Sequence, residues 1–244
     1  MNDRVLRHDT EGLCTLTLNR PDKLNALDTA TFEELDAHLA ALERETDRVG
    51  CVVLRGAGKG FCAGADLNAM GKLPVSPTFK PGVIERLGRL PQPVIAAVRG
   101  VCYTGALELA LACDFILADA TARFADTHGK WGLVGAWGMS QRLPRRIGVP
   151  AAKRMMMTAQ TLGAAEAKEI GLVDLLASDD GLDALVSSFS AAILANSWHT
   201  NFATKRLMHE TDGMPLTAAL AHAHYRHPGH APDYQDRIER FSKK

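Results

Sequence analysis

The sequence predicts an α/β fold followed by a section that is helical throughout. Two observations predict it. Short apolar runs typical of buried strands alternate with amphipathic stretches up to about residue 176, and only helical patterns follow. The chain has 244 residues, of which 46% are hydrophobic, so it is long enough for one globular domain with a large core.

The predicted elements follow from local pattern. The strands are short apolar runs at 4–7, 13–18, 51–54, 94–98, 115–118, 122–124 and 173–176. The helices are breaker-free stretches at 29–45, 83–90, 106–112, 139–143, 151–157, 164–170, 182–196, 203–209, 216–225 and 234–241. Asp28 or Thr29 fits the N-cap of the first helix, and the fourth is expected to end at 144–148. Residues 71–82 are expected to form a mobile loop beside a cleft or a plain surface loop.

Composition excludes several classes of protein. Lys plus Arg and Asp plus Glu number 28 each, so no nucleic-acid partner is indicated. The five cysteines contain no CxxC pair, which indicates small core residues in a reducing compartment. The apolar runs are too short to span a bilayer, no signal peptide is visible, and a cytoplasmic location is the expectation. Gly56, Gly58 and Gly60 match neither glycine-rich nucleotide motif.

The stretch from Pro93 to Asp114 carries the first candidate site. A buried strand is followed by Gly100 and Gly105, and a helix is expected to start near Gly105 with Glu108 in its first turn. A helix N-terminus offers backbone N–H groups and partial positive charge, and a glycine allows close approach of a ligand oxygen. This pattern is typical of half an oxyanion hole with an acid/base group beside it. The alternative is an ordinary helix start whose acidic residue suits the helix dipole.

Several separated motifs, in order, resemble the crotonase family, also called the enoyl-CoA hydratase/isomerase family, along nearly the whole chain. The matching pieces are 18–21, 25–27, 60–67, 93–100, 108–110, 113–114, Phe124, Gly132, 141–143, Ala164, Glu166, Ala167 and 171–173. The resemblance implies a spiral of ββα units with parallel strands, in a core spanning 1–190. It also implies that a C-terminal helical region, 191–244, builds a homotrimer or a dimer of trimers.

The resemblance also implies a ligand class and a set of site residues. The ligand would be an acyl-CoA thioester, with backbone N–H groups of Ala65 and Gly105 as the oxyanion hole. Substrate and CoA would be held around Ala63, Gly64, Asp66 and Leu67. Glu108 matches the first of the two catalytic glutamates. Coenzyme A enters as part of the substrate, so no separate cofactor and no metal are expected.

The chain departs from the family pattern at the second glutamate, where the spacing from Phe124 to Gly132 places His128. Around the first glutamate, the family's glycine run is reduced to Thr104-Gly105-Ala106. Trp137 replaces a small residue, which predicts a reshaped acyl pocket. Imidazole donates or accepts a proton near neutral pH, so a Glu108–His128 pair can serve acid/base chemistry. The alternative is a loop histidine that fills space or binds a backbone carbonyl.

The expected function is that of an enoyl-CoA hydratase-like lyase. Three alternatives stay open: an enoyl-CoA isomerase, an acyl-CoA thioester hydrolase, and a binder of acyl-CoA that has lost its chemistry. A histidine-rich patch near the C-terminus, His222, His224, His227 and His230, is a further candidate. Residues two apart on a helix face different directions, so a solvated or subunit-interface patch is expected there rather than a metal site.

Overall fold

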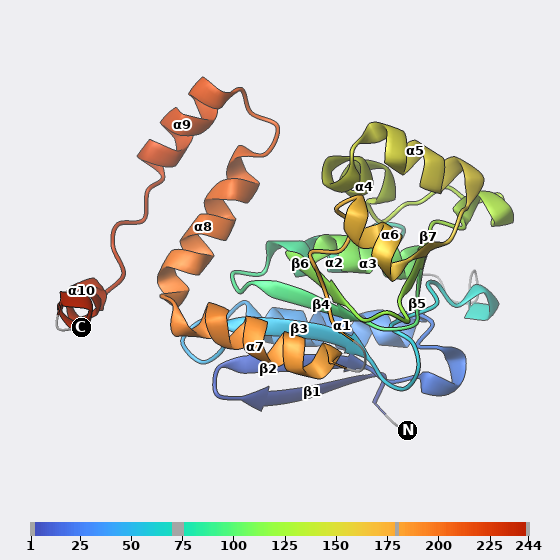
Figure 1. Ribbon diagram of the computed structural model, residues 1–244, viewed down its shortest axis with the longest axis horizontal. Helices are drawn as coiled ribbons and strands as arrows, with labels where there is room; N and C mark the ends of the chain where they lie inside the picture. Colours follow the sequence, from blue (N-terminus) through green and yellow to red (C-terminus); the bar gives the residue numbers. More distant parts are fainter. Residues whose placement is uncertain (1–2, 70–75, 179–180, 243–244) are drawn as a thin grey trace.

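The computed structural model describes residues 3–69, 76–178 and 181–242, and it has a mixed α/β architecture (Figure 1). Its strands are β1 Val5–Thr10, β2 Leu13–Leu18, β3 Cys51–Gly56, β4 Val94–Val98, β5 Val101–Tyr103, β6 Phe115–Ala118, β7 Arg123–Ala125, β8 Leu162–Gly163 and β9 Leu175–Leu176. Its α-helices are α1 Thr29–Leu42, α2 Phe79–Arg89, α3 Gly105–Ala112, α4 Met139–Ile147, α5 Val149–Thr158, α6 Ala164–Glu169, α7 Leu182–Ala195, α8 Trp198–Thr211, α9 Leu216–Tyr225 and α10 Tyr234–Ser242.

The strands form two sheets. The larger has the order β1-β2-β3-β4-β6-β9, and all its pairs are parallel except the β1–β2 hairpin. The smaller has the order β5-β7-β8, with β5 and β7 parallel. Because β4 belongs to one sheet and β5 to the other, the chain changes sheets at Arg99 and Gly100. This change of sheet leads directly into α3.

The larger sheet is covered on both faces because its central strands are apolar on both faces. In β4, Val94, Ala96 and Val98 pack in the main core with residues of α1, α2 and α3, whereas Ile95 and Ala97 pack beneath α7. Successive side chains of a strand point to opposite faces, so an uninterrupted apolar run fits a strand between two helical layers. The sheet therefore holds α3, and with it Glu108, in a rigid interior.

Asp28 caps α1, as predicted, by accepting a hydrogen bond from the Thr31 N–H. All five cysteines are buried and free, in agreement with the expected core role.

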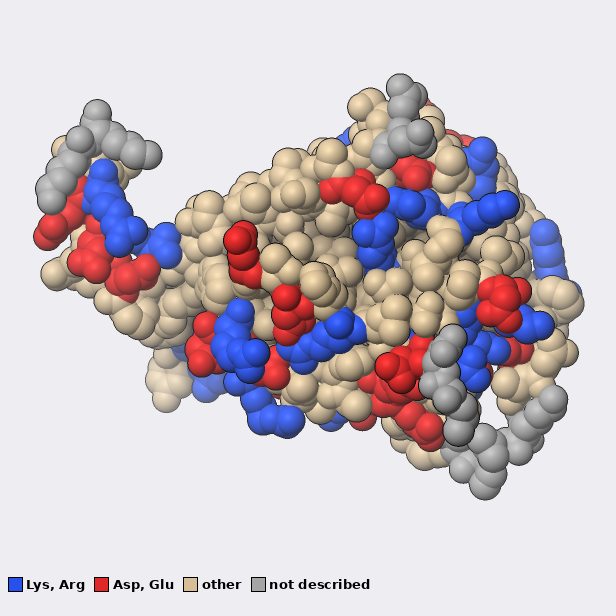
Figure 2. Space-filling view, turned by 90° about the horizontal axis from the view of Figure 1, so that it is seen from below, with Lys and Arg blue, Asp and Glu red and all other residues tan. Residues whose placement is uncertain are grey.

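No helix in the described ranges is long and apolar enough to cross a membrane. Basic and acidic side chains are interspersed on the face shown in Figure 2, as the balanced composition implies.

A buried lysine anchors the C-terminal helices to the core. Lys205 of α8 is 8% exposed, and its Nζ donates to Asp114 Oδ2 at 2.7 Å and to the Gln92 carbonyl at 2.9 Å. Asp114 Oδ2 also accepts the Val94 N–H, so this carboxylate joins α8 to the start of β4. Beyond α8, helices α9 and α10 stand away from the core (Figure 1). The predicted division of the chain at residue 190 stays a prediction.

Some local features differ from the predicted ones. Helix α2 begins at Phe79 rather than residue 83, because a proline and a glycine in its first turn are compatible with a helix start. Helix α4 includes Pro144 and ends at Ile147, within the expected end at 144–148, and it has Met139 and Leu143 buried beneath it. Strands β5 and β8 were not predicted, being only three and two residues long. Residues 71–75 of the expected loop lie outside the described residues.

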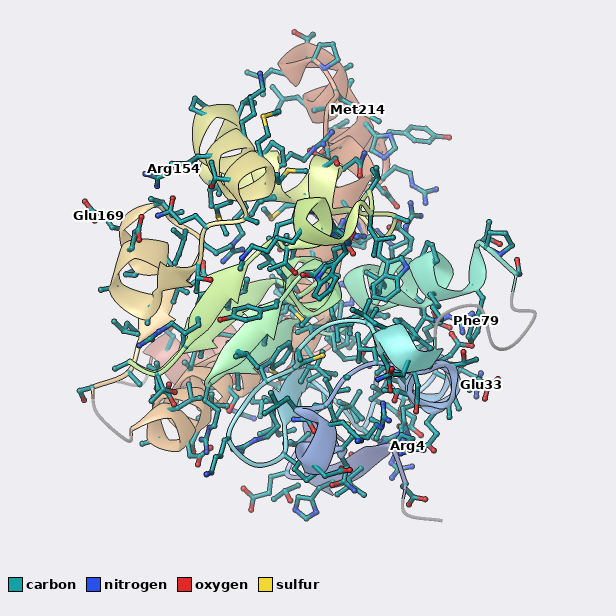
Figure 3. All side chains as sticks on the ribbon, turned by 90° about the vertical axis from the view of Figure 1, so that its right-hand side faces the viewer. Arg4, Glu33, Phe79, Arg154, Glu169 and Met214 are labelled. Atoms are coloured by element: carbon teal, nitrogen blue, oxygen red, sulfur yellow. The ribbon has the colours of Figure 1, made fainter. Side chains whose placement is uncertain are left out.

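Helices α4, α5 and α6 form an outer helical layer on the side of the molecule opposite α7 (Figure 1). Figure 3 shows Arg154 of α5 and Glu169 of α6 at its periphery, where both side chains point outward. Ala152 and Met155 of α5 and Ala167 of α6 are buried on the inner side. This layer lies over the end of β7 that leads to His128.

Candidate active site

The start of α3 is formed by an unusual backbone conformation. Thr104 has φ +56° and ψ −112°, a left-handed geometry that favours glycine. Its N–H donates to the Ala125 carbonyl at 2.8 Å, and its Oγ1 is hydrogen-bonded to Thr127 Oγ1. These contacts hold Thr104 in place, so that Gly105 opens the helix. The N–H of a first helical residue has no acceptor within its helix and is available to a ligand.

The segment around Ala65 lies against this helix start. In the bridge between Leu27 and Ala65, the Leu27 N–H donates to the Gly64 carbonyl, and the Leu27 carbonyl accepts the Asp66 N–H. The N–H of Ala65 therefore points away from Leu27. A Cβ built on Gly64 would lie 3.4 Å from the Gly105 nitrogen, and Ala65 and Gly105 line one cavity of about 400 Å³.

Glu108 is the buried acid of this cavity. It is 1% exposed, and its Oε1 accepts the N–H groups of Trp137 at 2.8 Å and Met139 at 3.0 Å. These donors occupy one carboxyl oxygen, so Oε2 is left facing His128. Burial raises the pKa of Glu108 because it disfavours the charged form, and the two N–H groups and His128 only partly oppose this.

His128 begins a 3₁₀ turn, His128–Trp131, directly after β7. Its Nε2 lies 3.8 Å from Glu108 Oε2, too far for a direct hydrogen bond. On the other side of the ring, Nδ1 lies 2.6 Å from Asp126 Oδ1. Burial alone lowers the pKa of His128, but the hydrogen bond and charge of Asp126, with the charge of Glu108, outweigh burial and raise it.

Trp137 forms the wall of the cavity above the helix start. Its ring meets Phe32 edge-on with 5.0 Å between centroids. A Cβ built on Gly105 would lie only 2.4 Å from Cζ3 of Trp137, so the indole covers this glycine closely. The remaining lining includes Tyr103, Thr104, Leu133 and Val134. Trp137 therefore lines the cavity, and the reshaping of the acyl pocket stays a prediction.

The other residues expected at the substrate site occupy different places. Ala63 and Leu67 line the cavity, whereas Gly64, at φ +98°, packs beneath it against the Tyr103 carbonyl. Asp66 forms an ion pair with Arg20 at 3.0 Å. This contact fits a structural role for Asp66 rather than one inside the cavity.

Sequence reasoning missed the groups that contact the two candidate acid/base residues. Asp126 and the N–H groups of Trp137 and Met139 contact His128 or Glu108 directly. The Asp-x-His spacing of Asp126 and His128 was a usable signal, because the side chain of an aspartate in a turn can reach the residue two positions later. The backbone donors depend on how residues 133–138 fold over the helix, which no local pattern records.

The histidine patch is not a metal cluster. His222 Nε2 lies 2.9 Å from Glu210 Oε2, and His230 packs on Tyr234. Across residues 3–69, 76–178 and 181–242, no group of three or more potential ligands is close enough to hold a metal ion.

Comparison with known proteins places this geometry in a family. The sequence matches the family described as enoyl-CoA hydratase/isomerase over residues 8–242. The chain belongs to the enoyl-CoA hydratase/isomerase family. It is similar to the 1,2-epoxyphenylacetyl-CoA isomerase of Escherichia coli, with 31% identity over 100% of this chain and 97% of that protein. It is also similar to the short-chain-enoyl-CoA hydratase of Clostridium acetobutylicum, with 34% identity over 81% of this chain and 77% of that one.

The solved structures agree. An enoyl-CoA hydratase from Bacillus anthracis matches with a TM-score of 0.93 and 30% identity, over 98% of this chain and 96% of that chain. The resemblance to the crotonase family is therefore confirmed, together with the mixed α/β fold, its parallel strands and its C-terminal helices. Membership of this family indicates an enzyme that acts on acyl-CoA.

Proposed function

We propose that this protein is an enoyl-CoA hydratase-like lyase that adds water to a 2-enoyl-CoA thioester. The observation that carries the proposal is the juxtaposition of Glu108 and His128, with 3.8 Å between Oε2 and Nε2. Both residues line the cavity that Ala65 and Gly105 also line. One group to activate water and a second to deliver a proton, beside two backbone donors, are the parts that hydration requires.

In the proposed reaction, the thioester oxygen accepts the N–H groups of Ala65 and Gly105. Glu108 takes a proton from water as the oxygen of that water bonds to Cβ, and negative charge develops on the thioester oxygen. The imidazolium of His128 then gives its Nε2 proton to Cα, which completes the 3-hydroxyacyl-CoA. A proton passes from Glu108 back to His128 to restore the starting state. Because the steps are proton transfers and the addition of water, with no net oxidation or reduction, the proposal includes no metal and no cofactor beyond the CoA of the substrate.

The test is a mass-spectrometric screen of the purified protein with a panel of CoA esters. Crotonyl-CoA, a 3-enoyl-CoA and a β-ketoacyl-CoA distinguish hydration, double-bond migration and thioester hydrolysis by product mass and retention. Hydration of crotonyl-CoA is expected. Binding of several esters with no product from any of them would contradict the proposal and favour a binder without chemistry.

Isomerisation is the second candidate, since one relative, matched over 97% of its length, is named as a 1,2-epoxyphenylacetyl-CoA isomerase. In that case a single residue of the pair would remove a proton from one carbon and return it to another. An isomeric CoA ester of unchanged mass, with no hydrated product, would favour this candidate over the lyase.

The rate of hydration is expected to fall at both ends of the pH range. Glu108 must be ionised to act as a base, so its raised pKa sets an acidic limb above that of an ordinary glutamate. His128 must be protonated to act as an acid, so its raised pKa sets an alkaline limb above that of an ordinary histidine. The profile of kcat/KM against pH measures both limbs.

The alkaline limb identifies His128. In His128→Ala the rate falls by roughly 10²-fold or more, and the histidine-like alkaline limb disappears. His224→Ala, which removes a histidine from the surface of α9, is the control and leaves both limbs in place. An unchanged profile in His128→Ala removes this residue from the mechanism.

The C-terminal helices are proposed to assemble the chain into a homotrimer or a dimer of trimers. Support comes from large apolar side chains that lie exposed on α8, α9 and α10, including Met208, Leu216 and Phe241. Apolar area of this kind favours burial against another surface. Sedimentation equilibrium is expected to give three or six times the mass of one chain, and a monomer at micromolar concentration contradicts the assembly.

A further inference from the structure

The proposed mechanism uses Glu108 and His128, but it leaves a third buried group unexplained. Asp126 is 2% exposed and lies at the end of β7, on the side of the His128 ring away from Glu108. Its Oδ1 accepts the His128 backbone N–H at 3.1 Å and lies 2.6 Å from Nδ1 of the same residue. One carboxyl oxygen thus fixes both the backbone and the ring of the histidine.

We infer that Asp126 is a positioning residue that keeps the Nδ1 proton on His128 and directs Nε2 at Glu108 and the cavity. The inference rests on the proposed function for its consequence, although the geometry is independent of it. An ionised carboxylate only accepts hydrogen bonds, so Nδ1 must be the donor. When the ring is charged, Nε2 also carries a proton and faces the substrate. When the ring is neutral, Nε2 is left as a free base.

The surroundings of His128 contain few competing charges. Glu108 of α3 faces Nε2, and Asp126 faces Nδ1. Lys130, in the same 3₁₀ turn, lines the cavity, and Lys153 of α5 lines a second cavity of about 360 Å³ on the other side of His128. No ion pair of either lysine with His128, Asp126 or Glu108 occurs in the described part of the chain. The two carboxyl groups thus dominate, and they favour the imidazolium.

This arrangement decides which member of the Glu108–His128 pair is the acid and which is the base. Because Asp126 favours the protonated ring, His128 holds the proton that goes to Cα, and Glu108 is left to take the proton of water. The imidazolium of His128 is then a cation beside the thioester, and its positive charge also stabilises the negative charge of the enolate-like intermediate. Without Asp126, a neutral ring could carry its proton on either nitrogen and its orientation would no longer be fixed.

The first test uses the wild-type protein. Ring nitrogen shifts of ¹⁵N-histidine-labelled protein, with His128 assigned by its loss in His128→Gln, report the protonation of each nitrogen across pH. Above the pKa of His128, the remaining proton is expected on Nδ1. A neutral ring protonated on Nε2 overturns the inference, and this measurement requires no variant at Asp126 to fold.

The second test is Asp126→Asn, which keeps the size and one acceptor oxygen but removes the charge. The pKa of His128 is expected to fall by about one unit or more, and the alkaline limb of kcat/KM, which reports the free enzyme, moves to lower pH by the same amount. At pH values above the alkaline limb of both proteins this lowers kcat roughly tenfold, whereas KM for the acyl-CoA changes less than about threefold because no substrate contact is removed. Glu210→Gln, which removes the carboxyl partner of His222, is the matched control and leaves the titration of His128 unchanged.

The outcomes separate the two proposals. An unshifted titration of His128 in a folded Asp126→Asn protein overturns the positioning role, whatever its activity. Wild-type protein that converts no CoA ester overturns the proposed function, while the titration still decides the role of Asp126.

Discussion

Glu108→Gln is expected to reduce kcat for hydration by about 10²–10⁴-fold, since the amide cannot accept the proton of water. The side chain keeps its size, and its oxygen can still accept the N–H groups of Trp137 and Met139. Burial raises the pKa of Glu108, which means that the ionised form is costly in the folded state. The melting temperature should therefore stay the same or rise while turnover is lost.

Steady-state kinetics and calorimetry of the same preparation measure both effects. The matched control is Glu166→Gln, which changes an exposed glutamate of α6 that pairs with Arg154, and it should leave kcat within about twofold. Retention of wild-type turnover in Glu108→Gln would remove this residue from the chemistry. Retained binding of the CoA ester without turnover is the expected companion result.

Gly105→Ala is expected to have the second large effect. The added Cβ would lie 2.4 Å from Cζ3 of Trp137, so the indole or the helix start must shift. Overpacking of this kind costs about 1–3 kcal/mol of stability. The shift also disturbs one proposed oxyanion donor and the Trp137 N–H that holds Glu108, so kcat/KM is expected to fall by roughly 10²-fold or more.

The double variant identifies the cause. In a Trp137→Ala background, Gly105→Ala should cost far less stability, because the atom that it meets is gone, and a thermodynamic cycle measures this coupling. Gly82→Ala is the matched control: among the described residues, no atom beyond its chain neighbours and its own helix backbone lies within 4 Å of the added Cβ, and the change should stabilise helix α2 by about 0.4–1 kcal/mol. Equal losses from Gly105→Ala in both backgrounds would contradict the proposed steric conflict.

The parts of the fold that sequence predicted well are those whose local pattern and tertiary role agree. Strands β2, β4 and β6 have the predicted bounds, since each is an apolar or alternating run bounded by polar or turn residues. Helix α9 also has the predicted bounds. Strands β5 and β8 are too short to carry a period, and they are strands because of their neighbours in the smaller sheet.

The candidate site divides in the same way. Glu108 could be found because a glycine, a helix start and a first-turn carboxylate lie within a few residues of each other. His128 required the family spacing, since a histidine in a loop has no local signature. The pairing of Ala65 with Gly105 depends on two segments far apart in sequence that meet at Gly64. Such contacts are properties of the folded chain rather than of any window of sequence.

The left-handed backbone of Thr104 has a consequence for protein engineering. A threonine in this conformation costs roughly 1–2 kcal/mol relative to glycine, and Thr127 and Ala125 hold it there. Selection for thermal stability alone is therefore expected to favour substitution of Thr104, which lies next to the candidate active site. Variant libraries selected for thermal stability are best screened for turnover in the same round. A substitution of Thr104 that raises stability also changes the backbone next to Gly105, and with it the proposed oxyanion donor.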